Sequence, residues 1–329
     1  MNRLIQHLLT VLLFAWLVPG AEGAVYRCPG PQGHPLFQDH PCTGTAAPAA
    51  APAPAATGGK HFLWRVEGKQ GSAWLLGSLH FGTPALYPLP APVTAAYEGS
   101  SALVVEADIL SGKGQSALLE VAQQGSYLDG TTLRDHLQPA TWNALERFTR
   151  RHQLPTELIA LQRPWLAALT VLGVALRGAG FDETLGIDRH FLQQARGRKP
   201  ILELESVGGQ MQLFADFSEA EQEEMLRQSL AEGDEGTDYF RRLISAWRQG
   251  DTLTVERLVR EDFTDDGALG EAMKERLFTA RNISMSDSIQ ALLEKGGGPY
   301  FVVIGAGHLV GEDSVVARLR QRGYTVTRH

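Results

Sequence analysis

The chain has 329 residues, 43% of them hydrophobic, and carries a formal net charge of −7 at pH 7. This length and composition allow one large domain with its own core and a small appendage. The negative balance disfavours nucleic acid and anionic membranes as partners, so we expect neither.

The first 23 residues have the pattern of a secretory signal peptide. Arg3 precedes an apolar run from Leu8 to Val18, followed by a Pro-Gly break and small residues up to Gly23. The run is about half of the ~20 residues that a membrane-spanning helix needs. We therefore expect cleavage before Ala24 and a mature protein that is periplasmic or secreted, without membrane insertion.

Residues 24–43 form a small module, which residues 44–60 separate from the rest of the chain. Cys28 and Cys42 are the only cysteines, and a pair so close together in an exported chain favours a disulfide over a metal site. The residues between them predict two short strands joined by a turn. The piece resembles a small N-terminal module of unknown function that occurs on many exported bacterial proteins. Residues 44–60 are rich in Ala and Pro and predict an extended linker.

The main domain, residues 61–329, alternates apolar strands with helical segments. The predicted strands are Phe62–Val66, Ala73–Leu76, Ala102–Val105, Ile201–Leu204, Tyr300–Ile304 and Tyr324–Thr327. The predicted helices are Thr141–Arg151, Glu157–Leu176 with an interruption at Pro164, Asp188–Ala195, and several between Ser218 and Lys295, the first of which starts at a capping box. The pattern predicts an α/β fold in which helices cover both faces of a sheet and a cleft lies at the strand ends.

A repeated motif marks the two ends of this domain. An apolar strand followed by Gly-x-x-His occurs at Gly77 to His80 and again at Gly305 to His308. One short match suggests an internal duplication but is weak evidence for a repeat. It does predict that both histidines leave equivalent strand ends, where open α/β sheets bind their ligands.

Four predicted strand ends deliver side chains that can carry out chemistry, namely His80, Glu106, Glu205 and His308. Imidazole and carboxylate groups are ligands for divalent transition metals, and a bound metal can acidify water to make a nucleophile. A lone histidine is more often a hydrogen-bonded structural residue, and a carboxylate at a strand end is often only solvated. The occurrence of all four at matching strand ends favours a functional site.

Other polar and aromatic residues have two interpretations each. Arg281 follows a helix-like stretch, Gly270 to Ala280, so it could bind the last carbonyls of that helix or act as a cation that faces a substrate carbonyl. Asp188 begins a helix, and capping is its ordinary role. Trp165 and Trp247 are large aromatics that we assign to the core or to a cleft wall.

Ordered motifs along nearly the whole main domain resemble the TraB/GumN family, which is related to the Tiki metalloproteases. They are LLGSLHFG with YPLP after it, LVVEAD, RPW, GID, LE plus Gln210, WRQGD, RN and FVVIGAGHLVG. The resemblance implies an α/β fold with a deep cleft and peptide hydrolysis supported by Mn²⁺ or Co²⁺. Carried over residue by residue, it implies metal ligands at His80, His308 and Glu106 and catalytic residues at Glu106, Glu205, Arg281 and Asn282.

Three hypotheses about function remain at this point. In the first, the chain is a metal-dependent hydrolase, a peptidase by resemblance, in which Arg281 polarises the scissile carbonyl. In the second, the same residues act without metal, with a histidine as general base, as folds of the erythromycin esterase type suggest. In the third, the chain is a periplasmic binding protein for haem, metal or peptide. The sequence specifies neither the substrate nor the oligomeric state.

Overall fold

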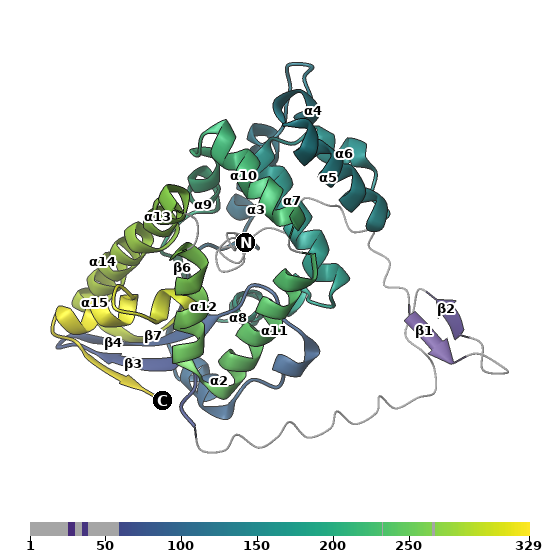
Figure 1. Ribbon diagram of the computed structural model, residues 1–329. Coiled ribbons are helices and arrows are strands. Elements are labelled where there is room, and N and C mark those ends of the chain that lie inside the picture. Colours follow the sequence, from purple (N-terminus) through teal and green to yellow (C-terminus); the bar gives the residue numbers. More distant parts are fainter. Residues whose placement is uncertain (1–25, 30–34, 39–58, 232, 265–266) are drawn as a thin grey trace.

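The computed structural model describes residues 26–29, 35–38, 59–231, 233–264 and 267–329 (Figure 1). Strands β1 (Tyr26–Pro29) and β2 (Pro35–Gln38) pair in antiparallel fashion, with Cys28 opposite Leu36. The predicted signal peptide lies outside the described residues. So do Cys42, the second half of the predicted disulfide, and almost all of the predicted linker.

One six-stranded sheet organises the main domain, in the order β6-β5-β7-β4-β3-β8. Strands β6, β5, β7 and β4 run parallel, and β3 is antiparallel to both β4 and β8. The strands are β3 (Leu63–Glu67), β4 (Gly71–Ser78), β5 (Ala102–Val105), β6 (Ile201–Glu203), β7 (Gly297–Gly305) and β8 (Thr325–Arg328). All six predicted strands are confirmed, with ends shifted by a few residues.

The central strands are apolar throughout because both of their faces are covered. All four residues of β5 are buried, and so is the second half of β7 from Phe301 onwards. On one face, Phe301 contacts Tyr97 and Phe191, which come from helices α2 (Ala91–Glu98) and α8 (Ile187–Ala195). Helices α14 (Ala280–Lys295) and α15 (Val315–Gln321) lie beside the sheet on its other side (Figure 1).

The remaining helices lie outside these two layers, and Figure 1 shows α4, α5 and α6 close together on the opposite side of the main domain from strands β3 and β4. They are α3 (Gly112–Gln124), α4 (Leu133–His136), α5 (Pro139–Arg151), α6 (Thr156–Ala160), α7 (Pro164–Gly178), α9 (Val207–Ala215), α10 (Glu219–Ala231), α11 (Gly233–Gln249), α12 (Thr252–Thr264) and α13 (Gly267–Lys274). Short helical turns are η2 (Pro84–Leu86), η3 (Glu183–Leu185), η4 (Glu275–Thr279) and η5 (Ala306–Leu309). No helix in the described part of the chain is long and apolar enough to cross a membrane.

Local sequence signals explain several helix ends. The predicted capping box is confirmed: the Ser218 backbone N–H donates to the Glu221 carboxylate at 2.8 Å, and the Glu221 N–H returns to the Ser218 hydroxyl at 3.4 Å. Pro164 stands in the first turn of α7, where its missing N–H costs nothing, so the predicted interruption is a break between α6 and α7.

One predicted helix end is wrong. We placed Arg281 at the end of a helix, but the chain continues through the π-helical turn η4 directly into α14, which begins at Ala280. No glycine or proline interrupts this stretch, so nothing stops the helix there. Arg281 therefore stands in the first turn of a long helix, next to a π turn of the kind that often accompanies functional sites.

Candidate active site

The carboxyl ends of four parallel strands carry the predicted site residues to one edge of the sheet. Glu106 follows β5 directly, and Glu205 comes two residues after β6. His80 comes two residues after β4, and His308 lies in η5 immediately after β7. Because β4 and β7 are hydrogen-bonded neighbours, with Ser78 opposite Gly305, the two Gly-x-x-His motifs leave the sheet side by side.

Arg281 joins the two glutamates in a buried ion-pair cluster. Its Nη2 donates to Glu106 at 2.6 Å and to Glu205 at 2.7 Å, and its Nε donates to Glu205 at 2.9 Å. The Arg281 and Glu106 side chains are each only 5% exposed, and that of Glu205 is 14% exposed. Gln210 of α9 bridges the same carboxylates, because its Nε2 donates to Glu106 at 3.0 Å and to Glu205 at 2.7 Å. The cluster fixes the ends of β5, β6 and α14 relative to one another.

Glu106 is held as a carboxylate. Burial alone would raise its pKa, but the Arg281 guanidinium, both histidines and the Gly305 backbone N–H, which donates at 2.6 Å, outweigh burial and lower the pKa to about 2. Burial alone would lower the pKa of Arg281, but the Glu106 and Glu205 carboxylates raise it. At neutral pH the pair is fully ionised.

His308 is completely buried and has one fixed ring nitrogen. Its Nδ1 lies 2.7 Å from Asn282 Oδ1, and the Asn282 amide nitrogen donates to the Asp313 carbonyl at 3.0 Å. Because Oδ1 can only accept, Nδ1 carries the proton and the Nε2 lone pair is free. Burial and the nearby Arg281 cation lower the pKa of His308 to about 3, so the ring is neutral.

His80 has an acidic neighbour that our sequence analysis assigned to capping. The Asp188 Oδ2 lies 3.2 Å from His80 Nδ1, an ion-pair contact and not a well-aligned hydrogen bond. Burial lowers the pKa of His80, but the Asp188 and Glu106 charges act in the opposite direction and the net effect is a raised pKa. Gly186 permits this contact: a Cβ there would lie 2.4 Å from the His80 carbonyl oxygen. The Gly-Ile-Asp motif thus positions the His80 loop.

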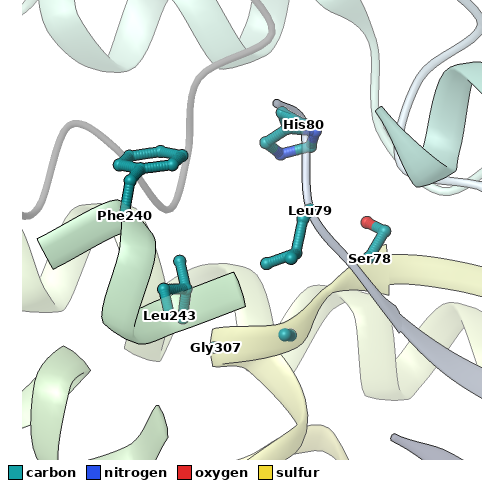
Figure 2. A pocket seen from close by; sticks show the side chains of 7 residues that line it. Ser78, Leu79, His80, Phe240, Leu243 and Gly307 are labelled. Atoms are coloured by element: carbon teal, nitrogen blue, oxygen red, sulfur yellow. The ribbon is translucent and has the colours of Figure 1, made fainter. Parts of the chain in front are cut away.

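A small hollow opens beside His80 (Figure 2). Its volume is about 10 Å³, room for about one water molecule, and it is lined by Ser78, Leu79, His80, Phe240, Leu243, Ala306 and Gly307. Figure 2 shows the His80 ring across a gap from Phe240 of α11. Both Gly-x-x-His motifs therefore contribute to one recess, with α11 as its opposite wall.

Several buried polar atoms at and near these strand ends lack a hydrogen-bond partner among the described residues. They include both ring nitrogens of His80, Nε2 of His308, Oγ of Ser78, Oδ1 of Asp188 and Oε1 of Gln210. A buried polar atom without a partner is costly, and native proteins rarely tolerate several close together unless water, an ion or a ligand satisfies them. The arrangement therefore fits a site that receives a polar ligand.

The two histidines offer donor atoms of the kind that a divalent metal binds, whereas the Glu106 carboxylate is less available. Each free Nε2 belongs to a ring whose Nδ1 faces Asn282 or Asp188, as is usual for metal-bound histidine. Three carboxylates, Glu106, Glu205 and Asp188, lie in the cluster or beside His80, together with the Arg281 guanidinium, and the Arg189 guanidinium also acts on Asp188. Glu106 already accepts donors at both oxygens. In the described part of the chain, no three His, Cys, Asp or Glu side chains are grouped closely enough to hold a metal.

Two contacts of the site come from residues to which our sequence analysis gave no role in it. Gln210 was named only as part of a motif, and Asp188 only as part of a motif and as a helix cap. Both lie on helices, and an argument from strand ends does not predict which side chains of a helix point toward the site. Arg281 also differs from the expectation that it faces a substrate carbonyl. Its guanidinium donates to the two glutamates and, through Nη1, to the Leu277 carbonyl at 3.3 Å.

Comparison with known proteins gives a consistent result. Residues 62–328 match the TraB/PrgY/gumN family. An uncharacterized protein, YbaP, from Shigella flexneri is 24% identical over 272 residues, which cover 81% of this chain and 96% of the relative. YbaP of Escherichia coli (strain K12) is 23% identical over 272 residues, which again cover 81% of this chain and 96% of the relative. A metalloprotease TIKI homolog from Amphimedon queenslandica is 38% identical over 75 residues, or 22% of this chain and 15% of the relative. No solved structure matches.

Proposed function

The chain belongs to the TraB/PrgY/gumN family, and from this premise we propose that it is a hydrolase that cleaves peptides with the help of a divalent metal, Mn²⁺ or Co²⁺, bound by His80 and His308. The partial similarity to a metalloprotease TIKI homolog supports the reaction type. The proposal includes export, which the N-terminal pattern of residues 1–23 supports, and a Cys28–Cys42 disulfide.

One observation carries the proposal: two buried imidazoles from adjacent strands each keep a free Nε2 while their Nδ1 atoms face Asn282 and Asp188. A purely structural histidine would be expected to satisfy both ring nitrogens. The carboxylates of Glu106, Glu205 and Asp188 add electrostatic support for a divalent cation.

Each residue of the site has a distinct task in this account. His80 and His308 would hold the metal, which when bound would supply Lewis acidity and acidify water. Asn282 and Asp188 orient the two rings. Arg281 and Gln210 keep the Glu106 carboxylate ionised and in a fixed place at the end of β5, where one remaining lone pair on Oε1 can accept a proton or a hydrogen bond from water.

A second candidate keeps the hydrolysis and drops the metal. The observation that favours it is the Asp188–His80 contact together with the raised pKa of His80, because a carboxylate that orients an imidazole is the usual partner of a histidine general base. In this case His80 would take a proton from water, Glu106 would stabilise the imidazolium that forms, and His308 would position the substrate.

Peptide cleavage by purified full-length chain without a histidine tag tests the proposal. A mixed peptide library analysed by mass spectrometry should yield products with wild type, and the products should vanish with His80→Ala and His308→Ala. His152→Ala is the matched control, because His152 caps α5 far from the recess and its loss should leave cleavage unchanged. If wild type and both site variants leave every peptide intact while Mn²⁺ is present and the fold is confirmed by circular dichroism, the chain is not a peptidase.

A further inference from the structure

A long groove lies along helix α11, the helix that also lines the His80 recess. Its volume is about 750 Å³, and it runs between the segment after the first Gly-x-x-His motif and helix α11. Its floor is apolar, formed by the buried side chains of Leu86, Phe181, Ile244 and Trp247. Lys60, Arg241 and Arg248 stand exposed along it. Among the described residues that line it, none is acidic.

The groove and the recess share a wall. Phe240 and Leu243 of α11 line the recess, and Ile244 and Trp247, one turn further along the same helix, line the groove. Phe181 of the groove lies against Phe240 with ring centroids 5.4 Å apart. Trp247 fixes α11 against the end of β4, because its Nε1 donates to the carbonyl of Gly77, which opens the first Gly-x-x-His motif, at 2.6 Å. A chain lying in the groove would therefore lead to His80.

The groove carries positive charge, whereas the whole chain carries a negative net charge. The protein carries a net charge of −7, yet the exposed ionisable residues along this surface are basic. Arg241 also pairs with Asp238 at 2.6 Å, so Lys60 and Arg248 contribute the larger part of the positive field. An apolar floor with a cationic rim is complementary to a segment that alternates aliphatic and acidic side chains. In an extended peptide successive side chains point to opposite sides, so an alternating sequence places its aliphatic side chains on one side and its acidic side chains on the other.

We infer that this groove binds the part of the substrate next to the cleaved bond, and that the substrate there is an extended peptide rich in aliphatic and acidic residues. The inference rests on the proposed peptide hydrolysis and adds the substrate class to it. The uncharged Ala/Pro-rich segment within residues 44–58 is the competing occupant from the chain itself, and it would leave Lys60 and Arg248 without counter-charges.

Direct binding by calorimetry tests the inference without relying on turnover. The probes are a synthetic peptide of alternating Leu and Asp, its Leu and Asn counterpart, and a peptide with the sequence of residues 46–57. Full-length protein should bind the acidic peptide more tightly than the neutral one. Arg248→Glu and Lys60→Glu should each weaken acidic-peptide binding by about threefold to tenfold, with the difference shrinking at high salt. Arg147→Glu, an exposed change on α5, is the matched control and should have no effect.

Equal affinity for the acidic and neutral peptides, or equal effects of Arg248→Glu and Arg147→Glu, would overturn the inference. So would tight binding of the 46–57 peptide in competition with the acidic one, which would assign the groove to the chain's own segment. Binding of the acidic peptide without any cleavage would contradict the proposed function and leave the groove assignment standing. Peptide cleavage with the same KM in wild type and in Arg248→Glu would contradict the groove assignment and leave the proposed function standing.

Discussion

Asn282 Oδ1 and His308 Nδ1 lie 2.7 Å apart in a fully buried position, and this contact determines which nitrogen of the histidine is available to a ligand. Asn282 comes directly after Arg281 on α14, so one helix turn positions both the histidine and the Glu106 carboxylate. The predictions below follow from this arrangement.

Two substitutions of Asn282 should separate its role in orienting the His308 ring from its contribution to the stability of the fold. Asn282→Asp keeps the acceptor for His308 Nδ1 and loses the amide that donates to the Asp313 carbonyl, whereas Asn282→Leu loses both. We expect Asn282→Leu to lower kcat strongly and to cost about 1 to 3 kcal/mol of unfolding free energy. Asn282→Asp should retain more metal affinity, because a carboxylate still orients the ring. Equal loss of metal binding in the two variants would argue against an orienting role.

Glu106→Gln should be destabilising as well as inactive. The two Glu106 oxygens accept from the Gly305 N–H, from Arg281 and from Gln210, so an amide can serve only one side and must turn its own N–H toward a donor on the other. Breaking one side of a buried ion pair costs about 3 to 5 kcal/mol, out of a total of about 5 to 15. Urea unfolding measures this cost. Glu205→Gln is the comparison: Glu205 is more exposed, so its variant should lose less stability.

Glycine positions around His80 give a test with a built-in control. A Cβ at Gly186 would lie 2.4 Å from the His80 carbonyl oxygen, and one at Gly82 would lie 2.1 Å from the Leu185 carbonyl oxygen. Gly186→Ala should therefore displace the His80 loop and reduce activity together with the melting temperature. Gly208→Ala on α9 meets nothing within 4 Å and should leave activity unchanged while stabilising by roughly 0.5 to 1 kcal/mol. Full activity in Gly186→Ala would show that the loop position is unimportant.

Acid should weaken the fold through His308 and Glu106. The pKa of His308 is lowered from 6.5 to about 3 and that of Glu106 from 4.5 to about 2, so in both windows the unfolded chain binds more protons than the native one. Unfolding free energy should therefore fall as pH drops from 6.5 toward 3, and further between 4.5 and 2. Urea titrations at a series of pH values measure it. His308→Gln removes the first contribution, so its stability should depend less on pH above 4.5; an unchanged slope would contradict a buried neutral ring.

The sequence predicted the strands well because a strand buried on both faces is a continuous apolar run, and Ala102–Val105 and Phe301–Ile304 are such runs. It also predicted that His80, Glu106, Glu205 and His308 share one edge, because parallel strands end together. It could not predict the partners of these residues. Asp188, Gln210 and Arg281 stand on helices, and their contacts depend on how those helices pack against the sheet.

The metal content of protein purified without a histidine tag tests the central claim most directly. After exposure to Mn²⁺ and removal of free ion, inductively coupled plasma mass spectrometry should find about one divalent metal per wild-type chain. His80→Ala and His308→Ala should lose it, and His152→Ala should keep it. Chelator should remove the metal and the peptide cleavage together, and Mn²⁺ should restore both. A wild-type chain that cleaves peptides, holds no metal and ignores chelator would contradict the metal site and support the Asp188–His80 pair as the catalytic base.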